Sequence, residues 1–191
     1  LGQERYAEAE AAFRKSRELG FTGAGEYYAR LHDARGAHAE SDRVYAESTS
    51  GKQGWRGEGG VSTWIDRGDL ERAGEVAAAW RKQAEDAGDV METLRARAAA
   101  ATVAAFAAPR DTTGMRGLLA TTRERAREID AIYPPASTEL QLYAGLLAAH
   151  AGDAALLADA LAGTKAAGAL HDFPTVAQLR QVLLAEQERM A

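Results

Sequence analysis

The chain has 191 residues, of which 46% are hydrophobic, and it carries a net charge of −5 with a pI of about 5.5. This length and composition suit one or two globular domains, and the acidic balance argues against direct binding of nucleic acid, which normally requires clustered Lys and Arg. The chain has no cysteine, which excludes disulfides, thiolate metal ligands and a cysteine nucleophile.

The N-terminal and apolar segments predict a soluble, cytoplasmic protein without a membrane partner. The opening LGQERYAEAE lacks the basic and then apolar pattern of a secretory signal, and the longest apolar run, 98–108, is shorter than the roughly 20 residues of a membrane span. Because the chain lacks an initiator Met and opens inside an apparent helix, we expect a piece of a larger protein. Its Ala, Gly and Arg bias without Asn suggests a bacterial source with a GC-rich genome.

Hydrophobic periodicity and helix-ending glycines predict an all-α chain of about nine or ten helices. The first helix runs from Arg5 to Leu19 and ends at Gly20. Pro134-Pro135 interrupts the pattern further on, and Ser137 or Thr138 is expected to start the next helix. The other predicted helices cover about 24–35, 37–48, 61–67, 70–87, 90–108, 113–133, two segments within 138–165, and a C-terminal segment after 171–174.

Three Asp residues each follow a Gly and precede a predicted helix. Asp69, Asp89 and Asp153 are therefore expected to accept a hydrogen bond from the first turn of that helix. Asp89 is followed three residues later by Glu92, which predicts a reciprocal capping box.

Small and aromatic residues recur at an interval of 32 residues. The three successive sets are Ala9, Phe13 and Ser16, then Ser41, Tyr45 and Ser48, then Ala73, Ala77 and Trp80, and Gly36 and Gly68 are separated by the same interval. Periods of this size are typical of helical solenoids. Near the C-terminus, LYAGLLAAHAGDAALLADAL places Gly145 at a predicted close helix crossing and Gly152 at a turn.

This pattern resembles the tetratricopeptide repeat. The residues that carry the resemblance are the turn Gly, the Tyr two places on, the Ala and the aromatic residue that follows. The resemblance implies a right-handed superhelical solenoid of antiparallel helix pairs, folded as one continuous domain over residues 1–191. Gly68 and Gly152 are 84 residues apart, which gives two longer units of 42 residues. The units are expected at about 1–20, 21–50, 51–88, 89–135 and 136–169, followed by a capping helix at 172–191.

No residue pattern indicates catalysis, so we expect a protein that is not an enzyme and has no cofactor. His32 and His38 are six residues apart, unlike the i, i+4 pair that binds zinc on one helix face, and the His-Asp pairs at 32–33 and 171–172 are adjacent and so face different directions. No Gly-x-Ser-x-Gly, Walker or dinucleotide-binding motif occurs. We therefore predict no metal site.

The resemblance implies a partner-binding surface on the concave groove. It assigns Tyr28 and Val61 to packing, and it places these residues in the groove: Glu26, Tyr27, Arg30, Trp55, Ser62 and Asp66. The Gly-rich stretch 50–60 is either a plain connector or a loop that displays Trp55 and Arg56 to a partner. The absence of Asn argues against the carboxylate clamp of tetratricopeptide domains that bind chaperone tails.

The predicted function is a non-catalytic scaffold for a protein or peptide ligand, as a module of a larger multidomain protein. One alternative is the effector-sensing helical arm of a bacterial signal-transduction ATPase or transcriptional regulator, which a deep apolar pocket with a few polar groups would favour. A second alternative is a homo-oligomerisation element, such as a homodimer paired through the apolar stripe Met115, Leu119, Thr122, Ala126, Ile129 and Tyr133.

Overall fold

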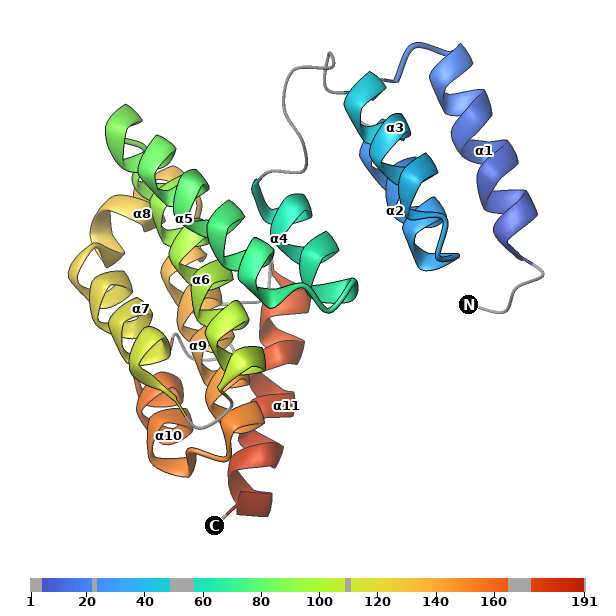
Figure 1. Cartoon of the computed structure of the whole chain (residues 1–191). Helices are drawn as coiled ribbons and strands as arrows, with labels where there is room; N and C mark the ends of the chain where they lie inside the picture. Colours follow the sequence, from blue (N-terminus) through green and yellow to red (C-terminus); the bar gives the residue numbers. More distant parts are fainter. Residues whose placement is uncertain (1–4, 22–23, 49–56, 109–110, 165–172, 191) are drawn as a thin grey trace. The chain divides into compact units, whose positions relative to one another are not determined.

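The computed structural model describes residues 5–21, 24–48, 57–108, 111–164 and 173–190 (Figure 1). Within these residues it contains eleven helices and no strand, which confirms the all-α prediction. Its contacts divide the chain into two compact units, residues 1–76 and 77–191, with the boundary inside helix α5 (Leu70–Ala87). The right-handed superhelix and the single continuous domain stay predictions.

Unit 1 is built on helix α2 (Ala24–Ala34), which contacts α1 (Tyr6–Glu18), α3 (His38–Ser48) and α4 (Gly57–Asp66). Its buried cluster is small and consists of Tyr28, Ala29, Val44 and Tyr45. Phe13 is only partly buried, with its ring centroid 6.1 Å from that of Tyr28. Burial of Tyr45 is as the 32-residue interval predicts, whereas Phe13 lies at the edge of the cluster.

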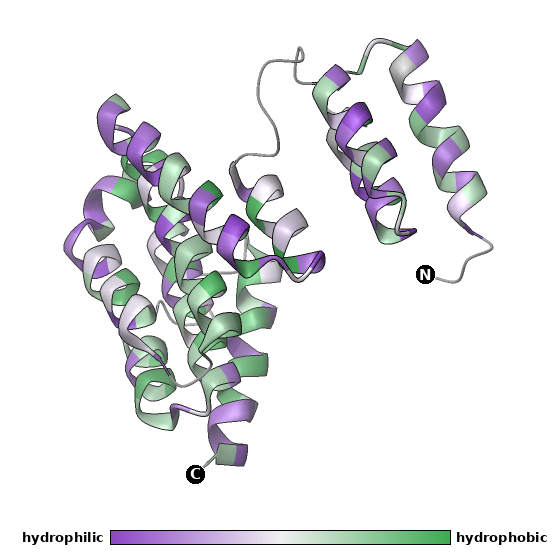
Figure 2. Cartoon of the chain, viewed as in Figure 1, coloured by the Kyte–Doolittle hydropathy of each residue, from purple (hydrophilic) through white to green (hydrophobic). Residues whose placement is uncertain are grey.

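Helix α9 (Ala136–Ala151) is the central helix of unit 2. This helix contacts α6 (Val90–Ala107), α7 (Thr113–Glu124), α8 (Ala126–Ile132), α10 (Ala154–Ala162) and α11 (Pro174–Met190). Helix α9 is mostly apolar and buries ten of its residues, while Glu139, Leu146 and His150 lie on its exposed side. Hydrophobic residues are common along the helices of unit 2 (Figure 2). The large core of unit 2 therefore forms around it, with Leu157 and Leu161 of α10 buried as predicted.

The predicted close helix crossing at Gly145 is confirmed. A Cβ atom built at Gly145 would lie 3.3 Å from the Ala160 Cβ and 3.5 Å from a methyl carbon of both Leu157 and Leu183. Side chains of α10 and α11 therefore fill the space beside this glycine, and the helices meet closely because residue 145 has no side chain.

The Gly-Asp junctions also form as predicted. Gly68, Gly88 and Gly152 adopt positive φ angles of 77°, 68° and 75°, which end the preceding helices in the left-handed conformation that favours glycine. The carboxylates of the Asp residues that follow accept hydrogen bonds of 2.9 to 3.0 Å from backbone N–H groups of the next helix. The pairs are Asp69 with Arg72, Asp89 with Glu92, and Asp153 with Leu156.

The reciprocal half of the capping box at Asp89 is wrong. The Asp89 N–H already donates to the carbonyl of Ala84 across the Gly88 turn, at 2.9 Å. The Glu92 carboxylate instead accepts from Trp80 Nε1 at 3.0 Å and from Arg95 at 2.8 Å. The glycine turn thus satisfies the donor that a capping box would need.

The predicted helix over 113–133 is broken at Arg125, where φ is −99° and ψ is 8°. The stripe still points inward on both sides of the break, because Met115, Leu119 and Ile129 are buried, while Tyr133 is 43% exposed. Since the apolar residues keep their spacing through the break, periodicity alone does not reveal it. Most of the stripe lies in the core of its own chain, and pairing of two chains through it stays a prediction.

Two helix starts lie earlier than predicted. Helix α4 begins at Gly57 instead of Val61, and burial of Gly60 and Val61 offsets the cost of glycine in its first turn. Helix α9 begins at Ala136, immediately after the Pro pair, because the Asp130 carboxylate accepts hydrogen bonds from the backbone N–H and the hydroxyl of Ser137, each at 2.9 Å.

Candidate functional site

The predicted groove residues of α2 lie on its exposed side. Tyr27 is 64% exposed and Arg30, three residues on and so on the same side of the helix, is partly exposed. The neighbouring Tyr28 is buried at 8% exposure, as the resemblance implies. The two adjacent tyrosines of α2 thus face opposite ways, Tyr27 toward solvent and Tyr28 toward the core.

Helix α4 shows the same division. Val61 is buried as expected, whereas Ser62 is partly exposed and Asp66 is exposed. Ser62 and Asp66 are four residues apart and so share one side of the helix, and the Ser62 hydroxyl donates to the Glu58 carbonyl at 3.0 Å. Trp55, Arg56 and the side chain of Glu26 lie outside the described residues.

A buried ion pair connects α2 with the end of α4. Arg67 donates from Nε to Asp33 Oδ1 and from Nη2 to Asp42 Oδ1, each at 2.8 Å, and the Arg67 and Asp33 side chains are both 8% exposed. Although burial opposes the charge, hydrogen bonds to the two carboxylates raise the pKa of Arg67. This cluster fixes α2 against α4 and holds their exposed faces in place.

The histidines of unit 1 do not form a metal site. The ring of His32 packs edge-on against Tyr28, with 4.7 Å between centroids, whereas His38 Nδ1 lies 2.7 Å from Asp33 Oδ1. Across the described parts of the chain, no group of three or more His, Asp or Glu side chains is close enough to hold a metal ion.

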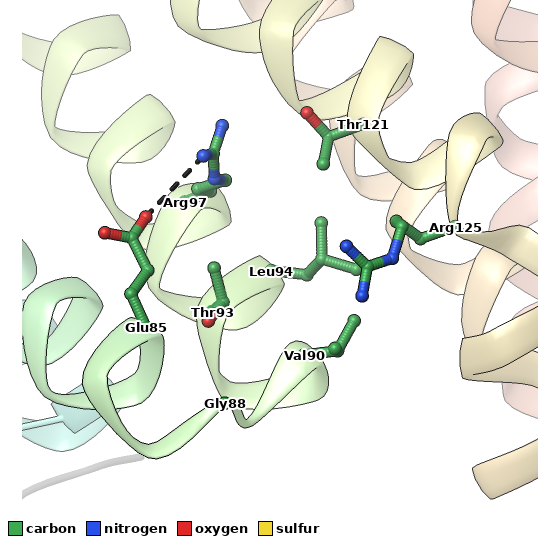
Figure 3. A pocket seen from close by; sticks show the side chains of 8 residues that line it. All are labelled: Glu85, Gly88, Val90, Thr93, Leu94, Arg97, Thr121 and Arg125. Carbon is green, nitrogen blue, oxygen red and sulfur yellow. Dashed lines mark ion pairs between the residues drawn. The ribbon is translucent and has the colours of Figure 1, made fainter.

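Unit 2 contains a pocket of about 310 Å³ between the end of α5, the first half of α6 and the end of α7 (Figure 3). The side chains from α6 recur at i, i+3, i+4 and i+7, so they share one face of that helix, and those from α7 are four residues apart. Its lining consists of Glu85, Gly88, Val90, Thr93, Leu94, Arg97, Thr121 and Arg125.

The pocket combines an apolar floor with two guanidinium groups. Val90 and Leu94 form the apolar part, and Arg97 and Arg125 stand on opposite sides of them (Figure 3). Arg97 pairs with Glu85 at 3.6 Å, which is beyond hydrogen-bond distance, and its Nε atom is buried without a hydrogen-bond partner. The lining thus has two positive charges and one negative charge.

The sequence pattern does not reveal this pocket. It places Arg125 on a solvated helix face, and no motif joins this residue to Arg97, which is 28 residues earlier on a different helix. The i, i+3, i+4, i+7 spacing of the α6 residues is visible in the sequence, but it is equally typical of an ordinary core-facing stripe.

Comparison with protein-family models, with curated proteins and with solved structures finds no match to this chain. The tetratricopeptide-like resemblance therefore rests on the residue pattern alone. No helix in the described part of the chain is both long enough and apolar enough to span a bilayer.

Proposed function

We propose that the chain is a non-catalytic interaction module and that unit 1 binds a protein or peptide segment along the exposed sides of α2 and α4. The observation that carries this proposal is the alternation of exposure at Tyr27 and Tyr28. Tyr28 is 8% exposed and anchors α2 in the core, whereas Tyr27 is 64% exposed. Tyr27 therefore offers a partner a large amphipathic side chain, and binding it costs little side-chain entropy.

The chemistry of this surface defines the kind of segment that it would bind. Tyr27 offers an aromatic face and Arg30 a planar guanidinium on the same side of α2. An extended segment with an aromatic or apolar side chain next to a carboxylate would match both groups, through ring packing and a bidentate hydrogen bond. The buried Arg67–Asp33 pair supports this proposal because it holds α2 and α4 together before a partner binds.

Selection of peptides from a random display library against the full chain would test the proposal. We expect selected peptides to combine an aromatic and an acidic residue, and the double variant Tyr27→Ala, Arg30→Ala to lose their binding at an unchanged melting temperature. Arg43→Ala is the matched control, because Arg43 is an exposed arginine on the adjacent helix α3. Peptides that bind the double variant as well as the wild type would refute the assignment.

A further inference from the structure

We propose that the pocket between α5, α6 and α7 binds a small organic acid, with its carboxylate held by Arg97 and Arg125 and its hydrocarbon part on Val90 and Leu94. This site is in unit 2 and is independent of the peptide surface proposed for unit 1.

Arg97 carries the first argument, because part of its hydrogen-bonding capacity is not used. Its Nε–H is buried and has no partner, and the nearest carboxylate, Glu85, lies 3.6 Å from Nη2 and is also 3.8 Å from Arg81 Nε. A buried donor without a partner destabilises a fold, and more so when the group is charged. A ligand carboxylate can accept two parallel hydrogen bonds from a guanidinium and so supplies what this side chain lacks.

Arg125 provides the second cationic group. It stands at the break between α7 and α8, and Figure 3 shows its guanidinium reaching toward Leu94. Its Nε donates to Glu128 Oε2 at 2.6 Å, which fixes the side chain at the edge of the pocket and raises the pKa of Arg125. The group therefore remains charged, and it is held beside the apolar floor at 43% side-chain exposure.

The rest of the lining selects a monoanion with an apolar part. Within the lining, two arginines and Glu85 leave one net positive charge, and Glu128 beside Arg125 reduces the positive potential further, which suits a single carboxylate better than a dianion. The hydroxyls of Thr93 and Thr121 already donate to backbone carbonyls of their own helices, at 2.7 and 2.9 Å, so they offer no donor to a second anionic group. A volume of about 310 Å³ is at the small end of the range for ligand pockets.

An NMR titration of the full-length ¹⁵N-labelled chain with hexanoate would test this proposal. We expect saturable shifts of the Arg97 Nε–H and of the Val90 and Leu94 amides, with an affinity about tenfold higher than for acetate because of the buried hydrocarbon. Arg97→Gln and Arg125→Gln should each weaken hexanoate binding about tenfold. The matched controls are Arg95→Gln on α6 and Arg127→Gln on α8, two exposed arginines that do not line the pocket.

Three outcomes would overturn the proposal. The first is hexanoate binding that is unchanged in Arg125→Gln, which decides the question even if Arg97→Gln does not fold, because Arg125 is outside the core. The second is an equal response to hexylamine at the same ionic strength, which would show that the carboxylate is not recognised. The third is binding of inorganic phosphate to the pocket with the same affinity as hexanoate, which would mean that the apolar floor does not contribute to binding.

Discussion

Replacement of Gly145 by Leu should destabilise unit 2, because the space beside this glycine is already filled. The neighbours Ala160, Leu157 and Leu183 are all fully buried, and the first added carbon would lie 3.3 to 3.5 Å from each of them. Three further carbons must enter the same space, so we take the upper part of the range for overpacking, about 3 kcal/mol. Leu also removes the cost of a helix-interior Gly, about 0.8 kcal/mol, which leaves a net loss of about 2 kcal/mol.

The same substitution at Gly117 is the control. Gly117 lies in the exposed face of α7, and no neighbouring atom is within 4 Å of the position that an added Cβ would take, so Gly117→Leu should stabilise the chain by about 0.8 kcal/mol through helix propensity alone. Urea denaturation followed by circular dichroism would measure both variants, with the free-energy changes taken at an unchanged m-value. A midpoint for Gly145→Leu equal to or above that of Gly117→Leu would refute the close helix contact at Gly145.

Three further predictions concern the two units. Arg67→Met should lower the free energy of unfolding by about 3 kcal/mol in urea denaturation, because it removes the arginine from the buried Asp33 carboxylate and leaves His38 beside it. A carboxyl NMR titration should give Glu10 a pKa below its usual value of 4.5, because the hydrogen bond from Arg14 stabilises the carboxylate. The stabilisation from Glu10 is therefore present above its unfolded-state pKa and is lost as the pH falls through the lowered folded-state pKa. Arg14→Gln should move the folded-state pKa of Glu10 toward the unfolded-state value, although Tyr28 and Arg35 still donate to this carboxylate, each at 3.3 Å. Leu161→Ala should cost about 2 to 5 kcal/mol by the same denaturation assay, because Leu161 is buried in the core of unit 2.

Helix ends were the most predictable part of the fold, because their signals are local. At Gly68, Gly88 and Gly152 the residue that tolerates a positive φ is followed by the residue that caps the next helix, so both halves of each junction are adjacent in the sequence. The contact at Gly145 was also predictable, since a glycine inside a strongly apolar helix indicates close packing.

Features that depend on competition between distant groups were not predictable. Asp89 and Glu92 have the spacing of a capping box, but the Ala84 carbonyl and the Trp80 indole take the groups that the box would use. The depth at which Phe13 is buried depends in the same way on how many helices cover it, and unit 1 covers it only in part. Spacing defines which groups could meet, and tertiary packing decides which do.

The break in the predicted helix lies beside the pocket, because Arg125 belongs to both. Arg125 is the residue at which α7 ends, and it is also the residue that brings the second guanidinium to the pocket. The Arg125 N–H still donates to the Thr121 carbonyl at 3.1 Å, as in a continuous helix, so Arg125 lies on the same side of α7 as Thr121 and borders the pocket with it. Since the apolar stripe passes through the break without a change of spacing, the sequence pattern reveals neither the break nor the pocket beside it.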